Sequence, residues 1–154
     1  MKEDDHFVKF GLSLTDSSLL SALCQFVWVQ SESLPLIFDV ENEIYTKQGI
    51  TLPVLKHLET IGLVIFEANG FVKKRFGKHI RLFYCGRPTK IGYENDGDNQ
   101  LDLGVILLTE RGKELVHGYK AIKNQEFYEY VISRWFQQGY LLSSIQVDRK
   151  NKYL

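Results

Sequence analysis

The side chains that most often do chemistry in proteins are spread through this chain without a catalytic spacing. The four histidines fall in four different expected elements and form no His-x-x-x-His pair of metal ligands. They are His6, His57, His79 and His117. No Gly-x-Ser-x-Gly nucleophile turn is present, and the carboxylates cluster in loops and termini, where solvent would surround them. The sequence therefore favours a binding module over an enzyme and predicts no catalytic residue.

The two cysteines, Cys24 and Cys85, also lack the spacing of a metal or disulfide site. They are far apart in the sequence, with no Cys-x-x-Cys pair and no histidine at ligand distance. Cys24 falls in an expected helix without a basic neighbour, so it is expected to be a small buried apolar residue. Reduced thiols of this kind are typical of a cytoplasmic protein.

Two short segments resemble ligand loops but depart from the patterns. The sequence GRPTKIGY at 86–93 has its glycines one residue too far apart for a phosphate loop, and no Lys-Ser or Lys-Thr pair follows, so a turn is expected. The sequence ENDGDNQLD at 94–102 has four carboxylates and no base, but a calcium loop would need glycine at Leu101 and glutamate at Leu107. We expect a mobile acidic loop there, with metal binding as the minor alternative. No metal site or cofactor is predicted.

The charge distribution is the strongest functional signal. Nineteen basic residues balance nineteen acidic residues over 154 positions, yet residues 68–93, called here the basic segment, contain seven bases and no acid. These bases are Lys73, Lys74, Arg75, Lys78, Arg81, Arg87 and Lys90. Such a concentration indicates binding to a nucleic-acid backbone, and outward-facing Phe71, Phe76, Phe83 or Tyr93 would stack on bases. The alternative is a solvated surface whose charges keep exposed strand edges from pairing.

The best-defined structural signal is at residues 51–64, TLPVLKHLETIGLV, which predicts a helix running into a strand. Thr51 is a helix cap, Pro53 is tolerated in the first turn, and Gly62 provides the left-handed residue that ends the helix. The apolar positions form one helical stripe: Leu52, Val54, Leu55, Leu58 and Ile61. The opposite face carries Lys56 and His57, which are further candidates for nucleic-acid binding.

The rest of the chain is expected to build an α+β domain around this helix. Helices are predicted at 16–30, 39–48 and 52–61, a wing at 63–108 with a hairpin at Asn69-Gly70, and a closing helix from 109 to about 122. A further amphipathic helix should end near Gly139, and Ile145 and Val147 indicate a last strand. The predicted common core is Leu20, Leu23, Val27, Leu55, Leu58, Leu63, Ile65 and Leu115.

Two motifs connect this arrangement to a known superfamily. The sequence LLTERGKELV at 107–116 resembles the Leu-Thr-x-x-Gly passage from the last wing strand to the closing helix in MarR-like and PadR-like winged helices. Together with LETIGLV at 58–64, it also resembles the C-terminal part of an uncharacterised bacterial family whose members carry a preceding helical region, which this sequence does not contain. The resemblance implies a winged helix-turn-helix core with an enlarged β wing and an additional C-terminal helix.

The resemblance also implies a domain division and a class of function. Residues 15–122 would form the winged-helix-like domain, between an N-terminal segment at 1–14 and a C-terminal helical extension at 123–154 with a short strand or tail. In this superfamily the third helix faces DNA or a protein partner. The expected function is therefore that of a transcription-regulator-type or mobile-element-associated DNA-binding module.

The alternative is an adaptor that uses the same fold to bind protein. The outward face of the third helix carries Glu59 and Pro53 beside Lys56 and His57, and it lacks the Arg, Asn or Gln side chains that read base edges. The aromatic C-terminal helix offers a surface for such a partner or for a homodimer, although burial within the same chain is the default expectation. No apolar run approaches the length of a membrane span, so a cytoplasmic protein without a membrane partner is expected.

Overall fold

The computed structural model describes residues 11–144, which fold into an α+β arrangement with antiparallel sheets, as the sequence predicts at that level. His6, most of the N-terminal segment, and the strand predicted at Ile145 and Val147 lie outside the described residues. The elements in chain order are α2 (Leu14–Cys24), β1 (Val27–Gln30), β2 (Glu32–Pro35), α3 (Glu43–Thr46), α4 (Leu52–Thr60), β3 (Val64–Phe76), β4 (His79–Tyr84), β5 (Arg87–Gly92), β6 (Asn99–Leu108), α5 (Glu110–Val116), α6 (Gln125–Gln137) and β7 (Leu141–Ser144).

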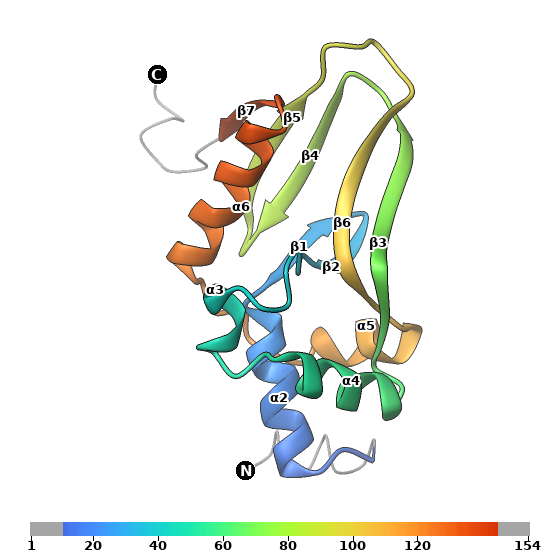
Figure 1. Ribbon diagram of the computed structural model, residues 1–154, viewed down its shortest axis with the longest axis vertical. Helices are drawn as coiled ribbons and strands as arrows, with labels where there is room; N and C mark the ends of the chain where they lie inside the picture. Colours follow the sequence, from blue (N-terminus) through green and yellow to red (C-terminus); the bar gives the residue numbers. More distant parts are fainter. Residues whose placement is uncertain (1–10, 145–154) are drawn as a thin grey trace.

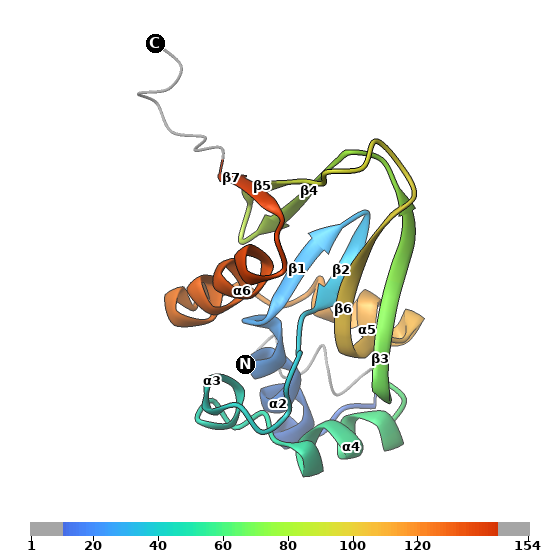
Figure 2. The same ribbon diagram turned by 45° about the horizontal axis from the view of Figure 1, so that its top comes forward.

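The strands form a five-stranded sheet and a separate two-stranded ribbon. The sheet has the order β2-β1-β4-β5-β7, and the ribbon consists of β3 and β6. Figure 1 shows the long ribbon beside the sheet, with helices α2, α4 and α5 gathered at the end of the molecule away from β7. The turned view in Figure 2 shows α6 lying along the larger sheet.

Helix α4 forms as the local signals predict. The Thr51 hydroxyl accepts a hydrogen bond from the Val54 amide at 3.4 Å, and Gly62 has a φ of 83°. The Leu63 amide then donates to the Leu58 carbonyl at 2.9 Å, which closes the end of the helix before β3 begins. Residues 51–64 are therefore a helix leading into a strand, as predicted.

The helix predicted at 16–30 is wrong in its second half. Helix α2 ends at Cys24, and β1 and β2 follow as a hairpin whose turn residue, Ser31, has a φ of 63°. The segment predicted only to break the helix, residues 31–35, is therefore mostly strand. Trp28 is buried while its neighbour Val29 is 41% exposed, which is the alternation of a strand. Over so short a length, the apolar run is compatible with both the helical period of 3.6 residues and the strand period of two. The pairing of β1 with β2 and β4 makes it a strand.

The hairpin predicted at Asn69-Gly70 is also wrong. Strand β3 continues through this point, and Gly70, with a φ of 84°, lies at an irregularity in the pairing of β3 with β6. Glycine here permits a bulge and not a reversal, because the long strand β6 pairs with β3 on both sides of it. The reversal occurs at Cys85 and Gly86, which both have positive φ angles, and residues 87–92 form β5 where a turn was predicted.

The remaining helices differ from prediction mainly in their ends. The second helix covers only Glu43–Thr46, capped by Asn42, because the Asp39 carboxylate instead accepts a hydrogen bond from the Glu41 amide in a local turn. The closing helix α5 ends at Val116, and Ile122, predicted on its apolar stripe, is 63% exposed. Helix α6 and its end near Gly139 are confirmed.

The core contains most of the residues predicted for it. Those buried are Leu20, Leu23, Leu55, Leu58, Leu63 and Leu115. Val27 is only half-buried in β1, and Ile65 is 46% exposed because it lies on the outer face of β3. The aromatic residues of α6 join this core, since Trp135 contacts Trp28 of β1 with ring centroids 4.9 Å apart. Burial within the same chain, the default expectation, is confirmed for Phe127, Tyr128 and Trp135, whereas Phe136 is 72% exposed.

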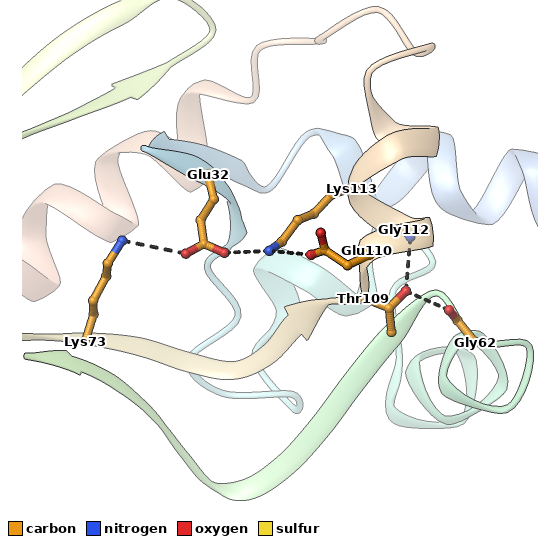
Figure 3. A network of polar contacts seen from close by, with 7 residues as sticks. All are labelled: Glu32, Gly62, Lys73, Thr109, Glu110, Gly112 and Lys113. Carbon is orange, nitrogen blue, oxygen red and sulfur yellow. Dashed lines mark hydrogen bonds and ion pairs between the residues drawn. The ribbon is translucent and has the colours of Figure 1, made fainter.

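The Leu-Thr-x-x-Gly motif ties α5 to the end of α4 (Figure 3). The Thr109 hydroxyl donates to the Gly62 carbonyl at 2.7 Å and accepts from the Gly112 amide at 3.0 Å, capping α5. A Cβ atom on Gly112 would lie 2.1 Å from the Leu63 carbonyl oxygen, so only glycine allows this approach. The motif therefore fixes the angle between α4, β3 and α5, and it contributes no reactive group.

Candidate nucleic-acid interface

The basic segment occupies the second half of β3 and all of β4 and β5. In Figure 1 the upper part of β3 rises to the top of the molecule, where β4 begins, and β5 returns beside β4. Its acid-free sequence therefore follows three successive strands at the end of the molecule opposite α4. The contacts that each basic side chain makes within the chain determine how much of this positive charge is available to a ligand.

Three of the seven predicted cations are held by other parts of the chain. The Lys73 ammonium donates to the Gln30 side-chain oxygen at 2.7 Å and lies 3.6 Å from a Glu32 carboxylate oxygen. Lys78 lies 3.5 Å from the Asp96 carboxylate of the acidic loop. The Arg87 guanidinium donates to the Ser144 hydroxyl at 3.0 Å and lies 5.2 Å from the Tyr128 ring centre.

The other four cations have no side-chain hydrogen bond or ion pair with any residue between 11 and 144. They are Lys74, Arg75, Arg81 and Lys90, called here the free cations. Lys90 is half-buried and the others are exposed. Arg81 and Lys90 are direct partners across β4 and β5, so two like charges lie opposite each other on one face of the sheet. Such a pair is unfavourable by itself, and an anion between the two side chains would relieve the repulsion.

The two α4 candidates are both exposed, and of the two only His57 has a side-chain hydrogen-bond partner among residues 11–144. The His57 ring nitrogen Nε2 lies 2.7 Å from an Asp16 carboxylate oxygen of α2. The Lys56 ammonium lies 6.0 Å from the centre of the Phe66 ring in β3, and Glu59 accepts a hydrogen bond from the Phe66 amide at 2.9 Å. The polar face of α4 therefore holds α4 against α2 and β3.

Glu32 is the acid that neutralises Lys73, and no local pattern in the sequence indicates this role (Figure 3). One Glu32 oxygen lies 2.9 Å from the Lys113 ammonium, and Lys113 also lies 3.1 Å from Glu110. The hydrogen bond from Lys113 lowers the pKa of Glu32, and the hydrogen bond to Glu32 raises the pKa of Lys113. Both shifts indicate a charged network that joins the β1–β2 turn to α5 and β3.

The candidate stacking residues differ sharply in accessibility. Phe83 is 40% exposed on β4, whereas Tyr93 is only 7% exposed and donates its hydroxyl to the Gln100 carbonyl at 3.0 Å. Phe71 and Phe76 are half-buried on β3. Phe83 is therefore the member of the predicted set that presents most of its ring outside the core.

A cavity of about 490 Å³ lies beside Phe83 and contains both cysteines in its lining. Burial raises the pKa of the Cys24 thiol to about 12 and also raises the pKa of the Cys85 thiol. Both thiols are therefore protonated at neutral pH, which is unfavourable for a nucleophile or a metal ligand.

The acidic segment predicted as a loop at 94–102 is wrong in its second half, because Asn99 begins β6 and pairs with Phe76 of β3. The side-chain amide of Asn99 donates to the Gly77 and Asn95 carbonyls, both at 3.0 Å, and an Asp102 carboxylate oxygen lies 3.2 Å from the Arg134 guanidinium of α6.

Among residues 11–144, no group of three or more His, Cys, Asp or Glu side chains is arranged to hold a metal ion. Over the same range, no helix has both the length and the apolar content that a membrane span requires.

Comparison of the chain with protein-family models, with curated proteins and with solved structures found no match.

Proposed function

We propose that this protein is a non-catalytic, winged-helix-like module that binds nucleic-acid backbone through the free cations of its wing. The proposal rests on four basic side chains that have no hydrogen-bond or ion-pair partner among residues 11–144, in a segment without acids and within a chain of zero net charge. Arg and Lys side chains that neutralise phosphates supply most of the affinity of sequence-independent nucleic-acid binding.

The order of elements supports the winged-helix part of the proposal. Helices α2, α3 and α4 are followed by β3, β6 and α5, which is the order that the resemblance implies. The chain adds a β1–β2 hairpin after the first helix and inserts β4 and β5 between the two wing strands. These two strands pair with the five-stranded sheet and not with the β3–β6 ribbon, so Arg81 and Lys90 lie in that sheet, whereas Lys74 and Arg75 lie in the ribbon.

The state of α4 supports backbone contact over base reading. His57 and Glu59 make polar contacts within the chain, and the helix presents the exposed Lys56 but no Arg, Asn or Gln to base edges. Contacts to phosphates position a protein on nucleic acid but carry little sequence information. Binding with little sequence preference is the expected behaviour.

The salt dependence of binding tests this proposal. If the four free cations each neutralise one phosphate, the slope of log affinity against log salt should be about −3.6 for duplex DNA and about −2.8 for a single strand. The measurement is a fluorescence-anisotropy titration at several salt concentrations, repeated with a variant in which Lys74, Arg75, Arg81 and Lys90 are all changed to Gln. Absence of binding at low salt, or equal binding by this variant, would overturn the proposal.

A protein-binding adaptor is the second candidate, and exposed apolar residues next to the aromatic core favour it. Phe136 on α6 is 72% exposed and Leu141 on β7 is 66% exposed. A partner, or a second copy of the chain, that covered both residues would remove substantial apolar surface from water. Sedimentation and pull-down before and after nuclease treatment distinguish the two functions, because only an adaptor keeps its partner once nucleic acid is digested.

A further inference from the structure

The two faces of the five-stranded sheet are in different environments. Helix α6 covers one face through Tyr128, which stacks near Trp28 and Tyr84 with ring centroids 5.8 Å and 5.9 Å away. Because side chains alternate along a strand, the neighbouring residues Val29 and Phe83 point to the opposite face. They are paired across β1 and β4, and they are 41% and 40% exposed.

The same open face carries two of the free cations. Arg81 is two residues before Phe83 on β4, so it shares the face with Phe83 at a distance along the strand of roughly 6.8 Å. Lys90 lies directly opposite Arg81 on β5. An exposed aromatic ring therefore has beside it two cations that no residue in the described range 11–144 neutralises.

On its other side, Phe83 borders the cavity of about 490 Å³. Its apolar lining includes Val27, Val29, Val116 and Ala121. Among the described residues that line the cavity there is no Asp, Glu, Lys or Arg, and its polar members include Ser33, His117 and Tyr119. Its volume is in the range of small-ligand pockets, and a mainly apolar lining with a few polar groups fits a planar base better than an ion.

These features occur in the order that a nucleotide requires: cations for the phosphate, a ring for stacking, and a mainly apolar hollow for the base. We propose that this open face binds single-stranded nucleic acid, with phosphate at Arg81 and Lys90 and one base stacked on Phe83 toward the cavity. The proposal rests on the proposed function and names its preferred ligand. A duplex keeps its base faces stacked inside, so Phe83 adds to affinity only for a single strand.

The probe is a short single strand carrying the fluorescent base 2-aminopurine, whose emission falls when the base stacks, beside a labelled duplex of the same sequence. Phe83→Ala should weaken single-strand binding about fivefold or more, remove the stacking signal, and leave duplex affinity unchanged. Phe83→Trp should retain both binding and signal. Phe136→Ala is the matched control, because it removes an exposed aromatic ring from α6, which covers the opposite face of the sheet.

A second pair of variants tests the cavity. Ala121→Trp places a large side chain in its lining and should weaken single-strand binding, whereas Ile122→Trp alters a neighbour that is 63% exposed and is not in the lining. Equal effects of these two substitutions would contradict seating of a base toward the cavity. Thermal melting of each variant shows that it is folded.

The outcomes separate this inference from the proposed function. If Phe83→Ala binds the single strand as well as the parent while the four-Gln variant does not bind, stacking is overturned and backbone binding stands. If Phe83→Ala unfolds, a folded Phe83→Trp variant that binds without a stacking signal also overturns the inference. If the parent binds neither nucleic acid at low salt, both proposals fail.

Discussion

Helix α4 and the basic segment both carry exposed basic side chains, but they differ in what those side chains contact. On α4, His57 reaches Asp16, and Lys56 lies over Phe66, so the polar face joins neighbouring elements. In the basic segment, four cations have no partner among the described residues, and Arg81 lies opposite Lys90. A basic side chain that already has an acidic partner within the chain contributes little to a binding surface, so a count of bases alone overstates the charge that a ligand meets.

The largest expected effect is a loss of stability at Gly112, where α5 packs closely against the start of β3. Gly112→Ala would place a Cβ atom 2.1 Å from the Leu63 carbonyl oxygen, so α5 or β3 must move. We expect the free energy of unfolding to fall by about 3 kcal/mol, measured by urea denaturation. Gly77→Ala, in the turn after β3, meets no atom within 4 Å and should change stability by less than about 0.5 kcal/mol. Similar losses from both substitutions would show that the close approach does not hold the scaffold.

A smaller loss is expected at the cap of α5. Thr109→Ala removes the hydrogen bonds of the Thr109 hydroxyl with the Gly112 amide and the Gly62 carbonyl, and should lower the free energy of unfolding by about 1–2 kcal/mol. Thr60→Ala removes a hydroxyl that bonds only to the Lys56 carbonyl on exposed α4, so we expect almost no change. Denaturation of the two variants side by side gives the comparison, and an unaffected Thr109→Ala protein would refute the structural role of the motif.

The Glu32 network should give a still smaller, pH-dependent effect. Because Lys113 lowers the pKa of Glu32 in the folded protein, the ionised carboxylate stabilises the fold fully above its ordinary value of 4.5. This contribution is lost as the pH falls through the lowered pKa. The Glu32 side chain is 38% exposed, so solvent screening limits the contribution to less than about 1 kcal/mol.

The corresponding measurement is the stability of Glu32→Gln and of the parent from neutral to acid pH. The two curves should differ at neutral pH and converge in acid. Asp96→Asn is the control in the wing, because the Asp96 side chain is 95% exposed and should contribute no such difference. A constant offset between the parent and Glu32→Gln at every pH would contradict a contribution from the charged carboxylate.

The sequence predicted the parts of this fold that depend on local signals. Thr51, Pro53 and Gly62 define α4 because capping and helix termination act within a few residues. The β1–β2 hairpin and the continuous β3 strand were missed because strand pairing with distant residues overrides short apolar runs and the Asn69-Gly70 turn signal.

In the candidate site, too, the sequence indicates the local features but not the contacts between distant residues. The seven bases of the basic segment are visible in the sequence, but the partner of Lys73 is Glu32, in a strand that was not predicted. The pairing of Arg81 with Lys90 and the outward orientation of Phe83 depend on the register of β4 with β5 and β1. Sequence alone therefore indicated a basic surface, and the structure reduces it to four free cations and one exposed ring.

Binding of nucleic acid through the wing is tested by changing one lysine in each region. Lys74→Gln and Lys56→Gln remove the same charge from an exposed position, one in the wing and one on α4. If the wing binds the backbone, Lys74→Gln should make the slope of log affinity against log salt on duplex DNA shallower by about 0.9, and Lys56→Gln should leave the slope unchanged. A shallower slope for Lys56→Gln with no change for Lys74→Gln would contradict the account and place the nucleic-acid contact on α4.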